Sequence, residues 1–427
     1  MGKIQLTEEI FIMKIFKKLI VLLFLLVLYL YVANITLMPK NIIIMQGENL
    51  SVSTLWGVNI KQIATTNPNL GQYDSNKLGI EQVSGGIDQD KQSGTIDLDV
   101  NILDTIPLKN IKVSVIPKTT VIPLGNSIGM KLYTKGVLVV GMSEIEGTKP
   151  YENSGIEEGD RIVQINDTEI TCTEDLVQTV NNSNGNQLKI KYIKDENETT
   201  MVANMTPAKT KQDEYKLGLW VRDAAAGVGT VTFYQPSTGK FASLGHGITD
   251  VDTGGLVKIA KGELVTANIL SIVKGKNGTP GELRGTIDGG DKLGEVYNNT
   301  SFGIFGKLSS TNKLDISSQN EMEVLSRDKV KTGKAQIICE IENGNRKYYD
   351  IEIKRVYTNN NSDNKSMLIK VTDSELLEKT GGIVQGMSGS PIIQDGKFVG
   401  AVTHVLVNDP TTGYGVFADL MLKEMAS

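Results

Sequence analysis

Residues 386–402 read GMSGSPIIQDGKFVGAV, and this stretch decides the fold of the C-terminal part of the chain. A serine in a glycine-rich turn leads into an apolar run, an Asp-Gly pair and a second apolar run, which predicts a turn that enters a β-hairpin. Glycines at 386 and 389 allow the backbone of such a turn to approach a substrate closely. Ser388 is therefore the candidate nucleophile. Ser390 is the alternative, although the Gly-x-Ser-Gly pattern centres on Ser388.

The chain has only two histidines, His246 and His404. A serine nucleophile is weak at its own pKa and needs an adjacent base. His246 lies in residues 243–250, SLGHGITD, a glycine-flanked turn that can leave an imidazole edge accessible. His404 lies in residues 401–406, AVTHVL, which predicts a strand that runs away from the serine. We therefore predict that His246 is the general base, with His404 as the alternative.

A third group should orient the imidazole and stabilise its charged form. Asp373 ends a predicted strand upstream of the serine. The order His, Asp, Ser along the chain also admits Asp288 and Asp291, so the order alone leaves three aspartates open. The glycine-rich serine turn resembles that of the chymotrypsin-like peptidases, and this resemblance implies that the backbone N–H groups of Gly386 and Ser388 bind the oxyanion that develops during attack.

The composition indicates a mostly β protein without nucleic-acid or metal chemistry. The 427 residues include 44 glycines and 11 prolines, which implies many turns. The net charge of -5 offers no basic surface for nucleic acid. No phosphate-binding glycine loop and no His/Cys/Asp cluster with metal-ligand spacing is present, so we expect no cofactor. The two cysteines, Cys172 and Cys339, fall in different predicted domains, so we expect no disulfide.

The N-terminal segment predicts a membrane anchor. Residues 19–33, LIVLLFLLVLYLYVA, are apolar, and the apolar character extends to Met38, close to the roughly 20 residues that span a bilayer. Residues 13–18, MKIFKK, place positive charge before this run. We therefore expect residues 1–18 in the cytoplasm, an anchor over 19–38 and export of the rest. A cleaved signal peptide is the alternative, and Met13 is a second candidate start of translation.

Residues 39–120 are expected to form an N-terminal extracytoplasmic β segment and a linker. Alternating apolar and polar residues predict short strands here. The predicted strands are Asn41–Met45, Leu50–Val58, Ile96–Ile102 and Ile111–Ile116. Between them, Tyr73–Thr95 is polar and rich in glycine, which indicates an exposed linker.

Residues 121–207 resemble a PDZ domain. Within them, residues 154–166, SGIEEGDRIVQIN, combine a Gly-Asp turn with a following strand, and Glu174–Asn181 is the expected second helix. A PDZ domain binds a peptide as an additional strand and holds its carboxylate with the backbone N–H groups of a loop. The resemblance implies that this peptide-binding loop comprises Ser127, Ile128, Gly129 and Met130.

Residues 211–427 are expected to form the last domain. Short strand-like pieces separated by turn residues favour a sandwich or a barrel over a βαβ array. A glycine-rich serine turn that feeds a hairpin resembles the chymotrypsin-like peptidases. The resemblance implies a mostly β fold in which an N-terminal transmembrane anchor and a PDZ domain precede a double β-barrel peptidase domain.

The combined features resemble the SpoIVB peptidases, a family of sporulation serine peptidases. These features are the apolar N-terminus, a PDZ domain before the peptidase domain, residues 244–250, LGHGITD, and residues 385–391, QGMSGSP. The resemblance implies a catalytic triad of Ser388, His246 and Asp373. It also implies that the enzyme cleaves itself near its N-terminus and then cuts a membrane-associated regulator of the protease that processes pro-sigma-K. The expected location is the space between forespore and mother cell.

Two other functions fit parts of the sequence. One is a quality-control serine protease of the HtrA type, although those enzymes place PDZ domains after the peptidase domain. The other is a PDZ scaffold without catalytic activity. The order of the domains favours the sporulation peptidase, and reaction with a fluorophosphonate would separate an enzyme from a scaffold.

Overall fold

The computed structural model describes residues 2–38, 40–46, 58–66, 73–74, 79–80, 94–102, 106–194, 198–287, 290–309, 311–358 and 364–426. They form two compact units, Met1–Lys118 and Thr119–Ser427. Some of the sequence expectations fall wholly or mostly outside the described residues. These are the strand Leu50–Val58, the linker Tyr73–Thr95 and the candidate acid Asp288.

The first unit begins with one long helix, α1 (Gly2–Leu37). In the described part of the chain, no helix reaches the length and apolarity that a membrane span requires. A sheet with the order β1-β6-β5-β2 follows the helix. Strand β1 is parallel to β6, and the other neighbours are antiparallel. The bounds are β1 (Asn41–Met45), β2 (Val58–Thr65), β5 (Gly94–Ile102) and β6 (Ile106–Ile116), and β3 (Tyr73–Asp74) pairs separately with β4 (Gly79–Ile80).

Alternating burial explains the register of this sheet. Ile96, Leu98 and Val100 of β5 are fully buried and pack with Ile111 and Val113 of β6. Because side chains alternate between the two faces of a strand, this apolar set covers one face of the sheet. Three predicted strands are therefore confirmed, at Asn41–Met45, Ile96–Ile102 and Ile111–Ile116.

Two closed barrels make up most of the second unit. The first barrel has the strand order β8-β17-β20-β21-β16-β15, and a pairing between β15 and β8 closes its ring. Its strands are β8 (Ser127–Met142), β15 (Leu219–Gln235), β16 (Lys240–Ser243), β17 (Ile259–Thr266), β20 (Lys292–Thr300) and β21 (Gly303–Leu308). Leu132, Phe241 and Leu264 are among the residues buried in its core. Strands β7 (Thr120–Pro123) and β22 (Met322–Glu323) extend the sheet beside β15.

The second barrel has the order β23-β24-β25-β28-β27-β26. Its strands are β23 (Gly333–Glu340), β24 (Arg346–Val356), β25 (Met367–Val371), β26 (Pro391–Gln394), β27 (Lys397–Leu406) and β28 (Asp409–Phe417). Asp395 and Gly396 join β26 to β27 with φ values of 51° and 73°, so the predicted Asp-Gly hairpin is confirmed. Together the two rings agree with the predicted double β-barrel.

Shorter elements complete the part of the second unit that holds the two barrels. They are the hairpin β18 (Asn268–Val273) and β19 (Glu282–Thr286), the helices α3 (Ser374–Thr380) and α4 (Ala418–Ala426), and the 3-10 helices η3 (Asn312–Leu314), η4 (Ile316–Ser318) and η5 (Arg327–Lys329). Arg327 of η5 holds α4 through a buried ion pair with Asp419 at 2.7 Å. A buried charge needs such a partner, so this pair fixes the C-terminal helix against the barrels.

The PDZ fold lies between two strands that the first barrel also uses. Its elements are β9 (Arg161–Ile165), β10 (Thr168–Glu169), α2 (Thr173–Asn182), β11 (Leu188–Ile193), β12 (Thr200–Met205), β13 (Ala208–Lys209) and β14 (Tyr215–Lys216). Val139, Ile162 and Ile190 are fully buried in its core, and Leu176 of α2 packs with them. The predicted helix Glu174–Asn181 is confirmed as α2.

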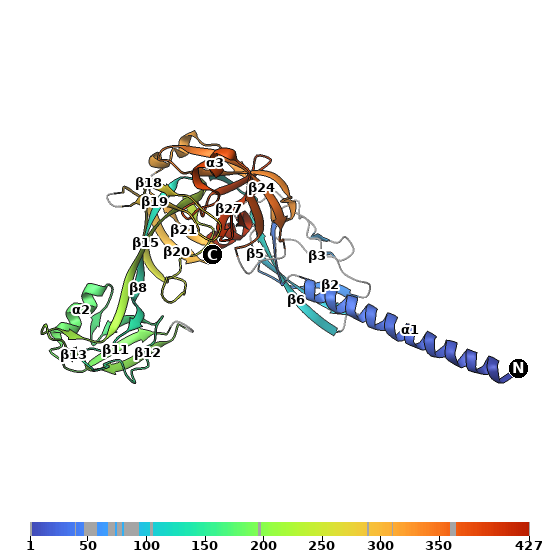
Figure 1. Ribbon diagram of the computed structural model, residues 1–427, viewed down its shortest axis with the longest axis horizontal. Coiled ribbons are helices and arrows are strands. Elements are labelled where there is room, and N and C mark those ends of the chain that lie inside the picture. The colour runs from blue at the N-terminus through green and yellow to red at the C-terminus, as the bar shows by residue number, and fades with distance from the viewer. Residues whose placement is uncertain are drawn as a thin grey trace. The chain divides into compact units, whose positions relative to one another are not determined.

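The predicted PDZ domain is less separate from the two barrels than the sequence suggests. Strands β8 and β15 pair along almost their whole length, from Leu219↔Met142 to Thr230↔Ser127, and Figure 1 shows them side by side. The half of β8 near Met142 also pairs with β9 of the PDZ domain, whereas the half near Ser127 also pairs with β17 of the barrel. The first barrel therefore uses residues on both sides of the PDZ domain.

The expected carboxylate-binding loop at Ser127, Ile128, Gly129 and Met130 is wrong. These residues form the first part of β8, and Ile128 and Met130 are buried in the barrel core. The strand pairs with β15 on one edge and with β17 on the other. A peptide can join a sheet only at a free edge, so no peptide can add a strand here.

Candidate active site

Ser388 lies in the turn that leads into β26. The turn needs glycine, because Gly386 and Gly389 have φ values of 98° and 99°. A Cβ atom at Gly389 would lie 2.2 Å from the carbonyl oxygen of Thr230 and 2.6 Å from the backbone nitrogen of Leu244. Glycine thus lets the serine turn pack backbone to backbone against the first barrel.

His246 follows β16 in a second unusual turn. Leu244 and Gly245 have φ values of 68° and 70°, and leucine rarely adopts this conformation. Thr230 of β15 joins the two turns. Its backbone N–H donates to the carbonyl of Ser388 at 3.1 Å, and its carbonyl accepts from the N–H of Leu244 at 3.2 Å. The two predicted catalytic turns therefore meet on one strand.

Ser388, His246 and His404 all line one cavity of about 450 Å³. The rings of the two histidines lie 5.0 Å apart between centroids, with 36° between their planes. The prediction that the strand of His404 runs away from the serine is wrong. Strand β27 returns past the serine turn, and the backbone carbonyl of Thr403 accepts a hydrogen bond from Ser388 Oγ.

The hydroxyl of Ser388 is bonded away from the candidate base. Ser388 Oγ donates to the carbonyl of Thr403 at 2.7 Å. His246 Nδ1 lies 2.9 Å from the carbonyl of Gly247, so Nδ1 carries the proton and Nε2 has the lone pair that a general base needs. Catalytic hydrogen bonds often form only when substrate binds, so a change of the Ser388 side-chain rotamer is the step that would join the two groups.

Burial lowers the pKa of His246 below the ordinary value of 6.5, and the carbonyl of Gly247 opposes this effect only in part. Desolvation disfavours the imidazolium form. The ring is consequently neutral at pH 7 and able to accept a proton from the serine.

Two backbone N–H groups are available beside the serine. The N–H of Met387 donates to the carbonyl of Val384 at 3.1 Å, and the N–H of Gly389 donates to Val402. Within the described ranges, no acceptor is found for the N–H groups of Gly386 and Ser388. Unpaired donors on either side of Met387 fit the predicted oxyanion site.

Asp373, the predicted third member of the triad, lies elsewhere. It is the N-cap residue of α3, where its Oδ1 accepts from the N–H of Leu376 at 2.9 Å. Its Oδ2 accepts from the N–H of Asp350 at 3.3 Å. Aspartate is among the best N-cap residues, which explains its place after β25. The structure brings Ser388 and His246 together but does not bring Asp373 to either of them.

The other candidate acids also have different partners. Asp291 pairs with Lys313 at 2.6 Å on the surface, and Asp288 lies outside the described residues. Asp250, close to His246 in sequence, is buried and pairs with Arg222. Among the residues described, the acceptor at His246 Nδ1 is a backbone carbonyl rather than a carboxylate.

The cavity around Ser388 is mainly apolar and continues into a second one. Leu244, Ile383, Val384 and Val405 are among its walls. The neighbouring cavity of about 610 Å³ shares Gly227 and Gly386 with it and adds polar side chains from β19. The two cavities share residues of β15 and of the serine turn, so together they offer a place for a peptide beside Ser388.

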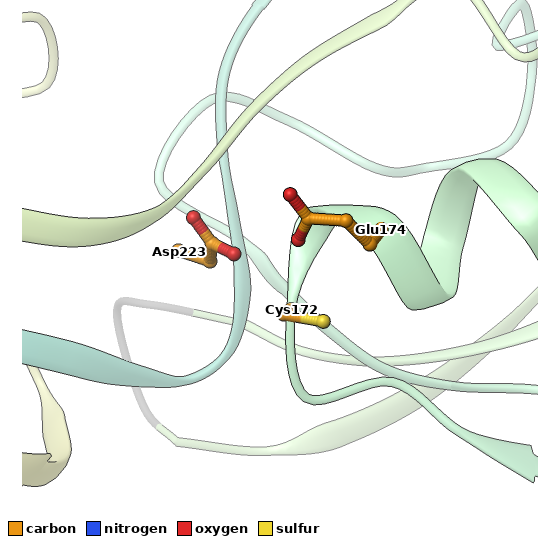
Figure 2. A group of neighbouring side chains, drawn as sticks. All are labelled: Cys172, Glu174 and Asp223. Carbon is orange, nitrogen blue, oxygen red and sulfur yellow. The ribbon is translucent and has the colours of Figure 1, made fainter.

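A group of possible metal ligands lies outside this cleft, in the PDZ domain. Cys172, Glu174 and Asp223 have ligand atoms within 4.8 Å of one another, and Figure 2 shows their side chains around the start of α2. No spacing in the sequence predicts this group, because Asp223 is distant along the chain from the other two residues. One oxygen of Asp223 already accepts from the backbone N–H of Thr173 at 2.7 Å.

Comparison with known protein families separates the PDZ domain from the part of the chain that contains Ser388 and His246. Residues 213–422 match the model of the SpoIVB peptidase S55 family, and residues 124–204 match the PDZ domain model. No curated protein matches the chain significantly.

Among solved structures, the Rv3671c protease from M. tuberculosis in its active form is 14% identical, with a TM-score of 0.27, over 60% of this chain and 86% of that chain. The PDZ domain of the SdrC-like protein Lmo2051 from Listeria monocytogenes is 17% identical, with a TM-score of 0.18, over 20% of this chain and 87% of that chain.

Proposed function

Because the chain belongs to the SpoIVB peptidase family, we propose that it is a sporulation serine endopeptidase whose nucleophile is Ser388 and whose general base is His246. The main support for assigning these two residues is that Ser388 and His246 line the same cavity. Ser388, in the glycine-flanked turn before β26, and both histidines of the chain line it.

The chemistry begins with rotation of the Ser388 hydroxyl from the Thr403 carbonyl toward His246 Nε2. Ser388 Oγ attacks the peptide carbonyl carbon while Nε2 takes its proton. The oxyanion is held by the N–H groups of Gly386 and Ser388. The imidazolium then gives its proton to the leaving amine, and an acyl-enzyme remains. In the second half of the reaction, water gives a proton to His246 and attacks the acyl group. The histidine then returns the proton to Ser388 Oγ, which releases the acid product and the free serine.

The orienting group for His246 is the open part of this mechanism. The resemblance to the family implies Asp373, whereas the geometry supplies the carbonyl of Gly247 at 2.9 Å. A backbone carbonyl can hold the Nδ1–H tautomer, although it stabilises an imidazolium less than a carboxylate does. We therefore propose a Ser388–His246 dyad in this conformation.

The proposed substrates are the chain itself and the membrane-associated regulator of the protease that processes pro-sigma-K. The PDZ match precedes the peptidase match along the chain, which supports this assignment over an HtrA-type protease. The free Gly386 and Ser388 N–H groups support an enzyme over a PDZ scaffold without activity. No step requires a cofactor or nucleic acid.

We also propose that α1 anchors the chain in a membrane and that the remainder acts in the space between forespore and mother cell. Large apolar side chains on α1 are exposed from Leu19 to Leu30, including Leu22 at 66% and Phe24 at 65%. Such exposure is costly in water and favourable in lipid. Alkaline carbonate extraction of membranes provides the test. The full chain should stay in the membrane fraction, and a chain that starts at Asn41 should not.

Self-cleavage is the direct test of the proposed function. We expect Ser388→Ala and His246→Ala each to abolish self-cleavage of the purified protein, and the double variant to be no worse than either one, because residues that act as a unit are not additive. Ser390→Ala is the matched control, since Ser390 Oγ is buried and donates to the carbonyl of Met387 at 2.7 Å. Continued cleavage in Ser388→Ala would end the proposal.

A further inference from the structure

Arg222 and Asp223 lie where β15 passes from the PDZ domain to the first barrel. Residues Leu219–Arg222 pair with the PDZ half of β8, and Ala224–Thr230 pair with its barrel half. The register shifts between Arg222 and Ala224, so Asp223 lies at an irregularity of the ladder. Successive side chains on a strand point to opposite faces of the sheet. Accordingly, Arg222 contacts a turn of the first barrel, whereas Asp223 contacts the PDZ domain.

Arg222 binds the turn that begins with His246. Its Nη1 donates to Asp250 and its Nη2 donates to Asp252 at 2.5 Å. The Asp250 side chain is 3% exposed, and its other oxygen accepts from the N–H groups of Asp252 and Thr253, each at 3.0 Å. Two charge-assisted contacts from one planar guanidinium fix both the position and the direction of the turn.

Asp250 closes this turn as well as receiving Arg222. Its N–H donates to the carbonyl of Gly255 at 2.8 Å, and Thr249 bridges to Leu256. Burial alone would raise the pKa of Asp250, but the N–H groups of Thr253 and Asp252 and the charge of Arg222 outweigh it and lower the pKa. Asp250 is therefore a carboxylate at neutral pH, and its buried charge depends on Arg222.

Asp223 contacts the PDZ domain. Its Oδ2 accepts from the backbone N–H of Thr173, the first residue of α2, at 2.7 Å. Its backbone carbonyl accepts from Thr134 Oγ1 of β8 at 3.2 Å. A carboxylate at a helix N-terminus satisfies an unpaired N–H and interacts favourably with the helix dipole. Figure 2 shows the Asp223 side chain directed at this helix start.

We propose that Arg222 is a positioning residue for the peptidase reaction and that Asp223 connects it to helix α2 of the PDZ domain. A shift of α2, such as a ligand of the PDZ domain would cause, moves Asp223 and with it the neighbouring Arg222, and so changes where His246 lies relative to Ser388. This inference rests on the proposed function, because it gives a regulatory input to the same site. The coupling element is the irregular step of β15, which both domains contact.

Steady-state kinetics of the full chain test the positioning role. We expect Arg222→Gln to lower kcat by about tenfold or more with little change in KM, since the cleft itself is intact, and Arg222→Lys to recover part of the loss. Asp252→Asn should show a smaller decrease in the same direction, because Asp252 is 47% exposed and leaves no buried charge behind. Arg355→Gln, at an exposed position of β24, is the matched control.

Hydrogen exchange tests the connection to the PDZ domain. In Asp223→Asn, peptides that cover residues 246–256 should exchange faster than in the wild type, although the hydrogen bonds of Asp223 go to Thr173 and Thr134. Unchanged exchange there, with faster exchange only around α2, would overturn the connection. If the kcat of Arg222→Gln and of Asp252→Asn equals the kcat of the control Arg355→Gln, Arg222 has no positioning role. Failure of the proposed function is a separate outcome, because the wild type itself would then not react with a fluorophosphonate.

Discussion

At the scale of single residues, the proposed general base His246 should determine how activity depends on pH. Burial lowers the pKa of this imidazole, so the neutral base persists to a lower pH than for an exposed histidine. We expect kcat/KM to stay level near pH 7 and to fall only below about pH 6.5. The measurement is the rate of cleavage of a peptide substrate from about pH 5 to about pH 8, the range in which histidine titrates. A fall that begins above pH 7 would contradict a lowered pKa.

The second histidine should modify this profile without replacing the base. The ring of His404 lies 5.0 Å from that of His246, and both rings line the same cavity. We expect His404→Ala to let water come closer to His246, and better solvation raises the pKa of that imidazole. The acid limb should therefore move to higher pH while most of the plateau activity remains. Loss of activity equal to that of His246→Ala, in a folded protein, would make His404 the base.

Asp373 provides the sharpest disagreement between family resemblance and geometry. As the N-cap of α3 it should be replaceable by Asn, which caps helices about as well, so Asp373→Asn should keep nearly normal turnover. Asp373→Ala should lower the free energy of unfolding by about 1 kcal/mol. Turnover and thermal unfolding of both variants decide the matter. A loss on the order of 10⁴-fold in Asp373→Asn would place this residue in the triad instead.

At the scale of elements, the serine turn depends on a contact between backbones. In Gly389→Ala the new methyl group would meet the Thr230 carbonyl at 2.2 Å, so the turn must move away from β15. We expect loss of activity and destabilisation of about 1–3 kcal/mol or more. Gly396→Ala in the following hairpin is the matched control, since its φ is also positive, at 73°, but nothing lies within 4 Å of the new atom. Equal effects of the two substitutions would show that φ strain alone is responsible.

Local signals in the sequence predicted some elements well and missed longer-range ones. The Asp-Gly pair predicts the β26–β27 hairpin because both turn residues must adopt positive φ. The small-residue stretch at Ala224–Gly227 carries no signal that β15 runs unbroken from Leu219 to Gln235. That strand is fixed by pairing with β8, a contact between distant parts of the chain. For the same reason, the mistaken loop at Ser127 could not be recognised as a barrel strand.

At the scale of the whole molecule, the meeting of Ser388 and His246 in one cavity could be predicted, because the sequence has a glycine-rich serine turn and only two histidines. The sequence could not show that His404 enters the same cavity, since this depends on how β27 crosses the serine turn. Nor could it show that Asp373 caps a helix, since an aspartate after a strand is compatible with either role. The proposed connection from helix α2 to the His246 turn, through Asp223 and Arg222, could not be predicted from the sequence either. It depends on strand β15 being shared by the PDZ domain and the first barrel.

The composition of residues 73–95 determines where we expect self-cleavage. Residues 73–95 are rich in glycine and polar side chains, a composition that peptidases cut readily. We expect the self-cleavage sites to fall between Pro39 and about Thr95, which mass spectrometry of the products will locate. Products cut only inside the PDZ domain or the barrels would contradict this expectation. The Ser388→Ala protein, incubated in parallel, controls for cleavage by other proteases.

The central claim is that Ser388 is a nucleophile activated by His246. The most direct measurement is reaction of the purified full chain with a fluorophosphonate, followed by mass spectrometry of the modified peptide. We predict a single adduct on Ser388 in the wild type, and strongly reduced labelling of Ser388 in His246→Ala because the serine has lost its base. An adduct on Ser390, or equal labelling of Ser388 with and without His246, would contradict the account.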